Sequence, residues 1–238
     1  MPDSIQLYGF RATLGLPDPS PFVVKTETYL RMLDVPYTKI SHINNLRKAP
    51  KKKLPYIVDG NNTIADTEFI IEYLKDHHQL DLDQWLSDTQ KSQAYLMRKS
   101  LDENFYWCLV YSRWAVDQSW ANYKKALLAD LPWPVSKLAP PIVRRGMLKT
   151  IKKQGLGRHS LEEVKTITNK TFSALSNLLA DQRYFFGDQP SSLDASVFAF
   201  VGGYTRIKLE TPFTALALQH QNLVEFCDRV HDAFFKEN

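Results

Sequence analysis

The chain has 238 residues, of which 44% are hydrophobic, enough apolar material for one large domain or two ordinary ones. Its formal net charge at pH 7 is +4, and it has neither a run of about 18 apolar residues nor, after Met1-Pro2-Asp3, a basic and then apolar leader. We therefore expect a folded cytoplasmic protein without a membrane span. Cys108 and Cys227 lie far apart, so a disulfide framework and a CxxC metal site are not indicated, and both thiols should be reduced and buried.

The first segment predicts a strand, a helix and a second strand. Residues 5–8 alternate with the period of a half-buried strand, and a Pro- and Gly-containing loop follows. Ser20-Pro21 then supplies an N-cap and a proline at the first helical position. The helical stripe ends at residues 34–36, and residues 37–40 are extended again. The stripe consists of Phe22, Val23, Thr26, Leu30 and Leu33.

A β-hairpin and a helix are expected next. Residues 54–58 form a compact strand pattern, Asp59-Gly60 or Asn61-Asn62 turns the chain, and residues 63–65 return it. Pro55 cannot donate a ladder hydrogen bond, which a cis Leu54-Pro55 bond at a special turn would explain. Asp66-Thr67 then caps a helix, whose buried stripe is Phe69, Ile70, Tyr73 and Leu74.

From Asp81 onward the periodicity is helical throughout. A long helix is expected over about residues 89–123, with breaks at the Pro-rich segments 131–134 and 139–141. Ser160 to Glu163 and Ser191 to Asp194 have the pattern of capping boxes, so a helix should begin at each. The fold class is thus an α+β part of order βαβ-ββα over residues 1–80, followed by an all-α part over residues 88–238.

These pieces, in this order, resemble the glutathione transferase superfamily, and the detail is most similar to its branch of failed-axon-connections and metaxin proteins. The resemblance covers nearly the whole chain and implies a thioredoxin-like N-terminal domain with a helical C-terminal domain. The segments that carry it together are residues 20–32, 53–57, 64–74, 155–160, 186–195 and 222–229.

The resemblance implies a glutathione site in the N-terminal domain. The backbone of Leu54, before a cis Pro55, would pair with the cysteinyl residue of the tripeptide as one more antiparallel strand. The Thr67 hydroxyl and the amides of the following turn would hold the γ-glutamyl carboxylate at the positive helix end, and Asp66 would accept the ammonium. Lys53 matches a position that contacts the glycyl carboxylate in some classes. Pro55 as a plain strand entry and Asp66-Thr67 as an ordinary cap remain the simpler alternatives.

Ser20 is the first candidate for the catalytic residue. In this family a hydroxyl or cysteine near the first helix stabilises the glutathione thiolate, and serine excludes a mixed disulfide at that position. The alternative is that Ser20 only caps its helix. Tyr8 is the second candidate, because tyrosine-type members have their hydroxyl there. The long loop of residues 9–19 leaves open whether Ser20, Tyr8 or Arg11 faces the sulfur.

Three aromatic residues, Trp107, Tyr111 and Trp114, recur at i, i+4 and i+7. Such a stripe is most often core, and the alternative is an apolar pocket for an electrophile between the two domains. By the resemblance, Asp194 is a structural capping acid.

Two tracts are basic and free of acids. Residues 47–53 hold five cations, and residues 131–160 hold seven Lys and Arg, namely Lys137, Arg144, Arg145, Lys149, Lys152, Lys153 and Arg158. Solvated faces explain such runs most simply, and an anionic ligand, a phosphate-rich surface or an acidic partner is the alternative. Neither His77-His78 nor His159 has metal-ligand spacing, and phosphate loops and nucleic-acid motifs are lacking, so no metal and no nucleic acid are expected.

The sequence therefore predicts a glutathione-dependent transferase of detoxification, which uses glutathione as co-substrate on a hydrophobic electrophile and is a possible homodimer. Two alternatives stay open: a non-catalytic scaffold of the metaxin kind, and a carrier of an apolar ligand.

Overall fold

A computed structural model of the protein describes residues 5–127 and 133–236. Two segments with expectations above lie outside the described residues. They are Met1 to Asp3 and the first half of the Pro-rich segment, Leu131 and Pro132.

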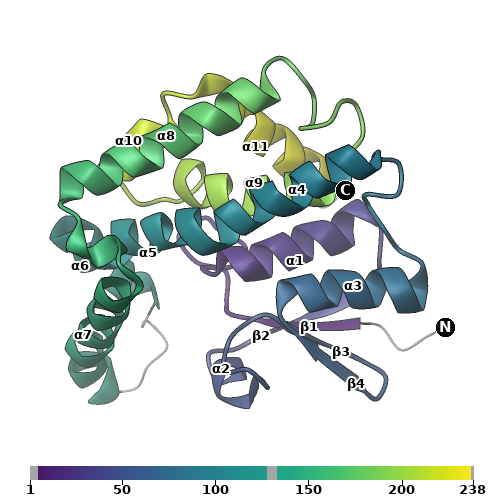
Figure 1. The fold of residues 1–238 in the computed structure, drawn as a ribbon. Coiled ribbons are helices and arrows are strands. Elements are labelled where there is room, and N and C mark those ends of the chain that lie inside the picture. The colour runs from purple at the N-terminus through teal and green to yellow at the C-terminus, as the bar shows by residue number, and fades with distance from the viewer. Residues whose placement is uncertain (1–4, 128–132, 237–238) are drawn as a thin grey trace.

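The strands all lie in the first 65 residues and form one sheet of order β2-β1-β3-β4. Strands β1 and β2 are parallel, while β3 is antiparallel to both β1 and β4. Helices α1 and α3 cover one face of the sheet and the short α2 lies on the other, which is the thioredoxin-like arrangement (Figure 1). The elements are β1 (Ile5–Gly9), α1 (Pro21–Met32), β2 (Tyr37–Ser41), α2 (Asn45–Lys48), β3 (Tyr56–Asp59), β4 (Asn62–Ala65) and α3 (Thr67–His78).

The second part is helical in all its described elements (Figure 1). The two-domain fold expected from the sequence is therefore confirmed. Its elements are α4 (Asp88–Ser100), a π-helical segment (Leu101–Phe105), α5 (Tyr106–Trp114), α6 (Asp117–Leu127), α7 (Val135–Gln154), a short 3-10 segment (Leu156–Arg158), α8 (Leu161–Leu179), α9 (Ser192–Thr205), α10 (Pro212–Ala217) and α11 (Gln221–Phe234).

Helix ends with local signals were predicted well. The Asp66 side chain accepts the Glu68 amide at the start of α3, a complete capping box opens α8 at Ser160, and at the start of α9 the Asp194 carboxylate accepts the amide and the hydroxyl of Ser191. Asp194 is fully buried and its carboxylate accepts from the amides of Ser191 and Phe185, which makes it a structural residue.

Two expectations about helix continuity are wrong. The long helix over residues 89–123 contains a π-helical segment and ends at Trp114, because the guanidinium of Arg144 takes the carbonyls of Trp114 and Ala115. The expected break at residues 139–141 does not occur, and α7 runs through Pro140 and Pro141. Both prolines lie in its first two turns, so the helix loses only the hydrogen bonds of those two missing N–H donors.

Helix α1 joins the two parts, because it packs both on the sheet and on α9. The ammonium of Lys25 lies 2.9 Å from the carboxylate of Asp102, and both side chains are buried. Burial lowers the pKa of Lys25, and Asp102 opposes that shift. Among the helices of the described residues, none is both long and apolar enough to cross a membrane.

Candidate functional site

The register of the sheet brings three distant chain segments to one end of it. Tyr8 pairs with Tyr56, and Tyr56 pairs with Ala65. Strands β1 and β4 therefore end where β3 begins. The residues that follow β1, precede β3 and follow β4 must lie close together at this end of the sheet. They include the predicted site residues Lys53, Leu54, Pro55, Asp66 and Thr67.

Asp18 holds Ser20 at the same end of the sheet, although a long loop separates Ser20 from β1. One oxygen of the buried Asp18 carboxylate accepts the amide of Phe10 at 2.7 Å, and the other accepts the amide of Ser20 at 2.9 Å. The two ends of the loop are thus held by one side chain. Gly9 is required beside it, since an added Cβ would lie 2.6 Å from the Asp18 carboxylate. The length of the loop therefore does not remove Ser20 from the end of β1.

The loop is also bound to the helical domain. Its tip turns at Leu14 and Gly15, both with positive φ, and the Leu14 carbonyl accepts the Lys208 amide at 2.7 Å. At the other end, the buried guanidinium of Arg113 donates to the carbonyl of Pro19 at 2.7 Å and to that of Gly203 at 3.0 Å. These contacts hold the residue before Ser20 in place from the second domain.

The hydroxyl of Ser20 is not used by its own helix. Ser20 has extended backbone angles at the N-cap of α1, yet its side chain makes no capping hydrogen bond, and Pro21 follows at the first helical position. A side chain that caps its helix accepts a hydrogen bond from a backbone amide of the first turn, and the Ser20 hydroxyl does not. The half-buried hydroxyl is left for another partner.

The beginning of α3 combines a cap with a second unused hydroxyl. Asp66 has a positive φ of 91° and accepts the Glu68 amide at 3.1 Å. Thr67 is buried, and its hydroxyl has no hydrogen-bond partner among the described residues. The Leu54-Pro55 peptide is cis, and the backbone of Leu54 has no partner in the described part of the chain either.

The three lysines of the basic loop differ in their contacts. Lys51 lies over the ring of Phe69, with its ammonium 4.1 Å from the ring centre, and Lys52 donates to the carbonyl of Arg47. Lys53 is exposed and makes no hydrogen bond or ion pair with another side chain in the described ranges. Of the three, only Lys53 keeps its ammonium unengaged among the described residues.

A layer of buried and half-buried charges beneath α3 was missed by the sequence reasoning. Glu68 receives the guanidinium of Arg98 through two bonds of 3.2 and 3.1 Å and also lies 3.4 Å from Lys99. Burial alone would raise the pKa of Glu68, but Arg98, Lys25 and Lys99 together lower it. With Asp102, this layer holds three cations and two carboxylates, so it leaves positive charge near the first turn of α3. The local sequence did not indicate this layer, because the partners of Lys25 and Arg98 lie 77 and 30 residues away in the chain.

Tyr8 is placed differently from Ser20. Its ring stacks on Tyr56 with centroids 4.3 Å apart, and its hydroxyl donates to Gln6 at 2.8 Å. Ile5 and Leu7 point to the face covered by α1 and α3, so Tyr8 and Gln6 lie on the opposite face. The Tyr8 hydroxyl therefore points back along β1 to Gln6.

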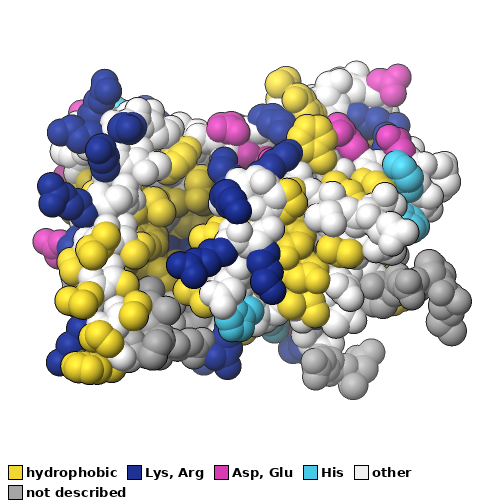
Figure 2. All heavy atoms as spheres, turned by 90° about the horizontal axis from the view of Figure 1, so that it is seen from below, with side chains coloured by type: hydrophobic (Ala, Val, Ile, Leu, Met, Phe, Trp, Pro, Cys, Tyr) yellow, Lys and Arg dark blue, Asp and Glu magenta, His cyan; other side chains and the backbone are white. Residues whose placement is uncertain are grey.

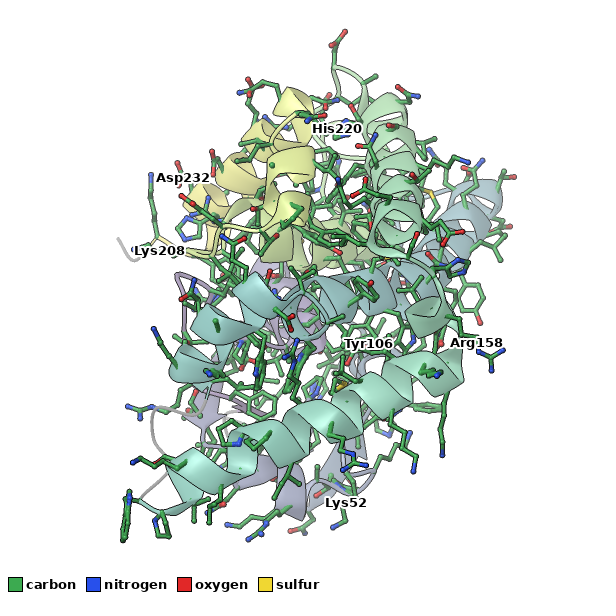
Figure 3. The ribbon with its side chains drawn as sticks, turned by 90° about the vertical axis from the view of Figure 1, so that its left-hand side faces the viewer. Lys52, Tyr106, Arg158, Lys208, His220 and Asp232 are labelled. Carbon is green, nitrogen blue, oxygen red and sulfur yellow. The ribbon has the colours of Figure 1, made fainter. Side chains whose placement is uncertain are left out.

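The predicted aromatic stripe consists of one buried residue and two half-buried residues that pack against the core. Trp114 is buried in the α5–α6–α7 core, where it stacks on Trp120 with centroids 4.8 Å apart, while Trp107 and Tyr111 are half-buried. The aromatic residue that reaches α1 is Tyr106, whose ring lies 4.9 Å from that of Phe22. Figure 3 shows Tyr106 between α5 and α7. Burial, with a smaller contribution from Tyr123, raises the pKa of Tyr106, and Arg113 opposes this.

A hollow with hydrophobic side chains inside it separates α7 from the α2 region, and Lys and Arg side chains stand on both of its sides (Figure 2). Within residues 5–127 and 133–236, no group of three or more His, Cys, Asp or Glu side chains is arranged to hold a metal ion. The residues at this end of the sheet supply hydroxyls, backbone groups, cations and the Asp66 carboxylate.

Comparison with protein families gives two matches on this chain. A glutathione S-transferase N-terminal domain matches residues 21–120, and a glutathione S-transferase C-terminal domain matches residues 168–230. Among solved structures, a glutathione transferase of Phanerochaete chrysosporium aligns over 100% of both chains with a TM-score of 0.69 at 14% identity. One of Ceriporiopsis subvermispora, solved in complex with glutathione, aligns over 98% of this chain and 99% of its own with a TM-score of 0.63 at 16% identity.

Curated relatives extend the comparison. An isoprene-epoxide glutathione S-transferase of Rhodococcus sp. strain AD45 is 30% identical over 97% of this chain and 99% of its own length. The failed axon connections protein of Drosophila melanogaster is 31% identical over 83% of this chain, which spans about half of that relative, 49%. Human metaxin-2 is 24% identical over 89% of this chain and 81% of its own. With these matches over both domains, the chain belongs to the glutathione S-transferase family.

Proposed function

We propose that the protein binds glutathione at the end of the sheet described above and transfers its sulfur to an electrophilic carbon. The tripeptide is held by Lys53, Leu54, Pro55, Asp66 and Thr67. The observation that carries the proposal is the Ser20 hydroxyl. This hydroxyl makes no capping bond to its own helix, and the Ser20 backbone amide donates to Asp18, which places the residue at the end of β1.

The chemistry follows from the charges of this site. The N-termini of α1 and α3 carry partial positive charge, which favours the γ-glutamyl carboxylate and a thiolate over a thiol. The Ser20 hydroxyl donates to the sulfur and lowers its pKa. The thiolate then attacks carbon, and with an epoxide the C–S bond forms as the ring C–O bond breaks and the oxygen takes up a proton from solvent. We choose an epoxide as the electrophile class because the Rhodococcus relative is named for one.

Calorimetry with glutathione tests the binding step. Thr67→Val removes one unused hydroxyl at nearly constant volume and should abolish binding, whereas Thr63→Val, at an exposed position of β4, should not change it. Glutathione that fails to bind the wild-type protein would sink the proposal.

Thiolate absorbance against pH tests the role of Ser20. In the complex with Ser20→Ala, the pKa of the bound thiol should rise toward the free-cysteine value of about 8.5. Turnover of an epoxide at neutral pH should fall about 10²-fold, with glutathione binding retained. Tyr8→Phe should leave both unchanged, because the Tyr8 hydroxyl is bonded to Gln6. A loss of turnover in Tyr8→Phe alone would assign the hydroxyl to Tyr8 instead.

A cytoplasmic location, detoxification and a homodimer belong to the same proposal, and light scattering on the purified chain tests the dimer.

The second candidate is a scaffold protein. The observation that favours it is the exposed apolar side of α7, which the transferase reaction does not require. The carrier alternative would use the half-buried Trp107 and Tyr111, with Tyr106 in place of the buried Trp114.

A further inference from the structure

Helices α6 and α7 form a hairpin that projects beyond the rest of the helical domain (Figure 1). Helix α7 is held to the protein through one stripe of side chains. Arg144 donates to the carbonyl of Trp114 and pairs with Asp117, Met147 contacts the α5–α6 core, and Ile151 is buried in it. These residues recur at helical spacing, so the opposite side of α7 faces away from the α5–α6 core.

That opposite side is apolar near the start of the helix. Leu138 is 63% exposed and Ile142 71%, and Val135 is one turn earlier on the same side. Trp133, just before the helix, is 76% exposed. Single exposed apolar residues are ordinary on protein surfaces, but contiguous ones mark an interaction site. These four large apolar side chains lie together on one projecting element and therefore indicate an interaction surface.

The same side becomes basic along the helix. Arg145 and Lys149 continue the row of Leu138 and Ile142, and neither has an ion-pair partner among the described residues. Helix α7 contains six Lys and Arg and no Asp or Glu. The side chains on this hairpin change from hydrophobic at one end to Lys and Arg at the other, as Figure 2 shows.

The second basic tract lies on the same face of the molecule. Viewed from below, the α2 region and the projecting hairpin both present Lys and Arg side chains to the viewer (Figure 2). Arg47, Lys48 and Lys53 are exposed there, with no acidic residue in the tract. Two acid-free tracts about 90 residues apart in the chain therefore form one cationic face with an apolar edge.

We propose that this face docks on a bilayer surface that contains anionic lipids. Leu138, Ile142 and Trp133 enter the boundary between headgroups and acyl chains, and Arg145 and Lys149 contact the lipid phosphates. An amphipathic helix that lies in the interface buries its apolar side by about 5–10 Å, which is within reach of a projecting hairpin. A second copy of the chain is disfavoured, because pairing the apolar sides would bring like charges together. An acidic polypeptide would satisfy the cations and leave the apolar side uncovered.

Co-sedimentation with phospholipid vesicles tests the proposal, with no glutathione present. Vesicles of phosphatidylcholine mixed with phosphatidylserine should retain the protein, and phosphatidylcholine alone should retain much less. Arg145→Gln/Lys149→Gln should weaken binding about 25-fold, since each cation near an anionic surface contributes about fivefold. The Leu138→Asp and Ile142→Asp variants should abolish it.

Matched controls lie elsewhere on the surface. Leu178, in α8, is 51% exposed, so Leu178→Asp places the same charge at a similar leucine outside the hairpin and should bind like wild type. Lys91→Gln/Lys170→Gln removes two cations from α4 and α8 and should have little effect. Circular dichroism of every variant establishes that it is folded. A blue shift of fluorescence on vesicle binding should be lost in Trp133→Phe.

Two outcomes would overturn the proposal. Equal retention on neutral and anionic vesicles, or full retention of Leu138→Asp, would show that α7 is not the docking element. Absence of vesicle binding, together with a wild-type oligomer that Ile142→Asp dissociates, would show that a second copy covers this face. Neither outcome bears on glutathione binding, so the transferase proposal is tested separately.

Discussion

The ammonium of Lys25 in α1 and the carboxylate of Asp102 before α5 form a buried ion pair between the two domains. Their side chains are only 1% and 8% exposed. Removing one partner leaves the other charge buried without compensation. We therefore expect Lys25→Met to lower the free energy of unfolding by about 3–5 kcal/mol, measured by urea titration.

The double variant Lys25→Met/Asp102→Leu is the control for that prediction. It removes both charges and should regain most of the lost stability, because a packed apolar pair is comparable to a buried ion pair. Lys165→Met breaks the exposed pair with Glu162 and should cost less than about 1 kcal/mol. A small effect of Lys25→Met would contradict the account of this contact.

Asp18 predicts a pH dependence of stability. Burial raises its pKa to about 7, with Lys39 and the amides of Ser20 and Phe10 opposing and Glu27 adding to the shift. Between the ordinary value near 3.8 and about 7, the folded protein holds a proton that the unfolded chain has lost. The contribution of Asp18 to stability is thus fully present at low pH and is lost as pH rises through this window.

The comparison that isolates this effect is Asp18→Asn, which cannot titrate. The unfolding free energy of wild type minus that of the variant should fall between the ordinary value of 3.8 and about pH 7 and then level off, measured by urea titration at each pH. A difference that grows with pH instead would mean that Lys39 overcomes burial and holds the pKa low.

Two glycines should respond to alanine in opposite directions. Gly9→Ala puts a Cβ 2.6 Å from the Asp18 carboxylate and 2.7 Å from Val23, so it should destabilise the protein by about 1–3 kcal/mol. In Gly146→Ala the added Cβ meets nothing within 4 Å, in the middle of α7. This variant should stabilise by about 0.5–1 kcal/mol, read as a rise in the melting temperature. Equal effects of the two variants would mean that Asp18 does not closely approach Gly9.

Both cysteines should be unreactive in the folded protein. Cys108 and Cys227 are fully buried, and burial raises the pKa of Cys227 to about 12 and that of Cys108 above its usual range. A disulfide reagent that reacts with thiolates should label neither in native buffer and both in denaturant. If the native protein were labelled as fast as an exposed thiol, the burial of both cysteines would be contradicted.

The sequence predicted best what is decided locally. The caps at Asp66, Ser160 and Ser191 depend on residues at most three positions apart, and each is present in the structure. The order of strands and helices followed from periodicity for the same reason. The Ser20 hydroxyl was recognised as a candidate, but whether it serves its helix could be decided only from the geometry.

Tertiary contacts decided what the sequence missed. The end of α5 depends on Arg144, which lies 30 residues later in the chain. The roles of Asp18 and Arg113 depend on partners in the loop and in α9, and nothing in their local sequence indicates them. The burial of Trp114 agrees with the reading of the stripe as core, but the contact of Tyr106 with Phe22 of α1 was not expected, because helical spacing gives the faces of a helix and not which neighbour covers each face.

The attachment of the first loop at Asp18 separates two tasks of that loop. Its base sets the position of Ser20, and its tip, at Leu14, touches the helical domain near Lys208. Insertions or deletions between the base and the tip would change how the loop covers the second domain while leaving the hydroxyl in register with the sheet. The loop can thus vary in length among descendants of one ancestor at little cost to the site, which makes it a natural place for evolutionary change in this family.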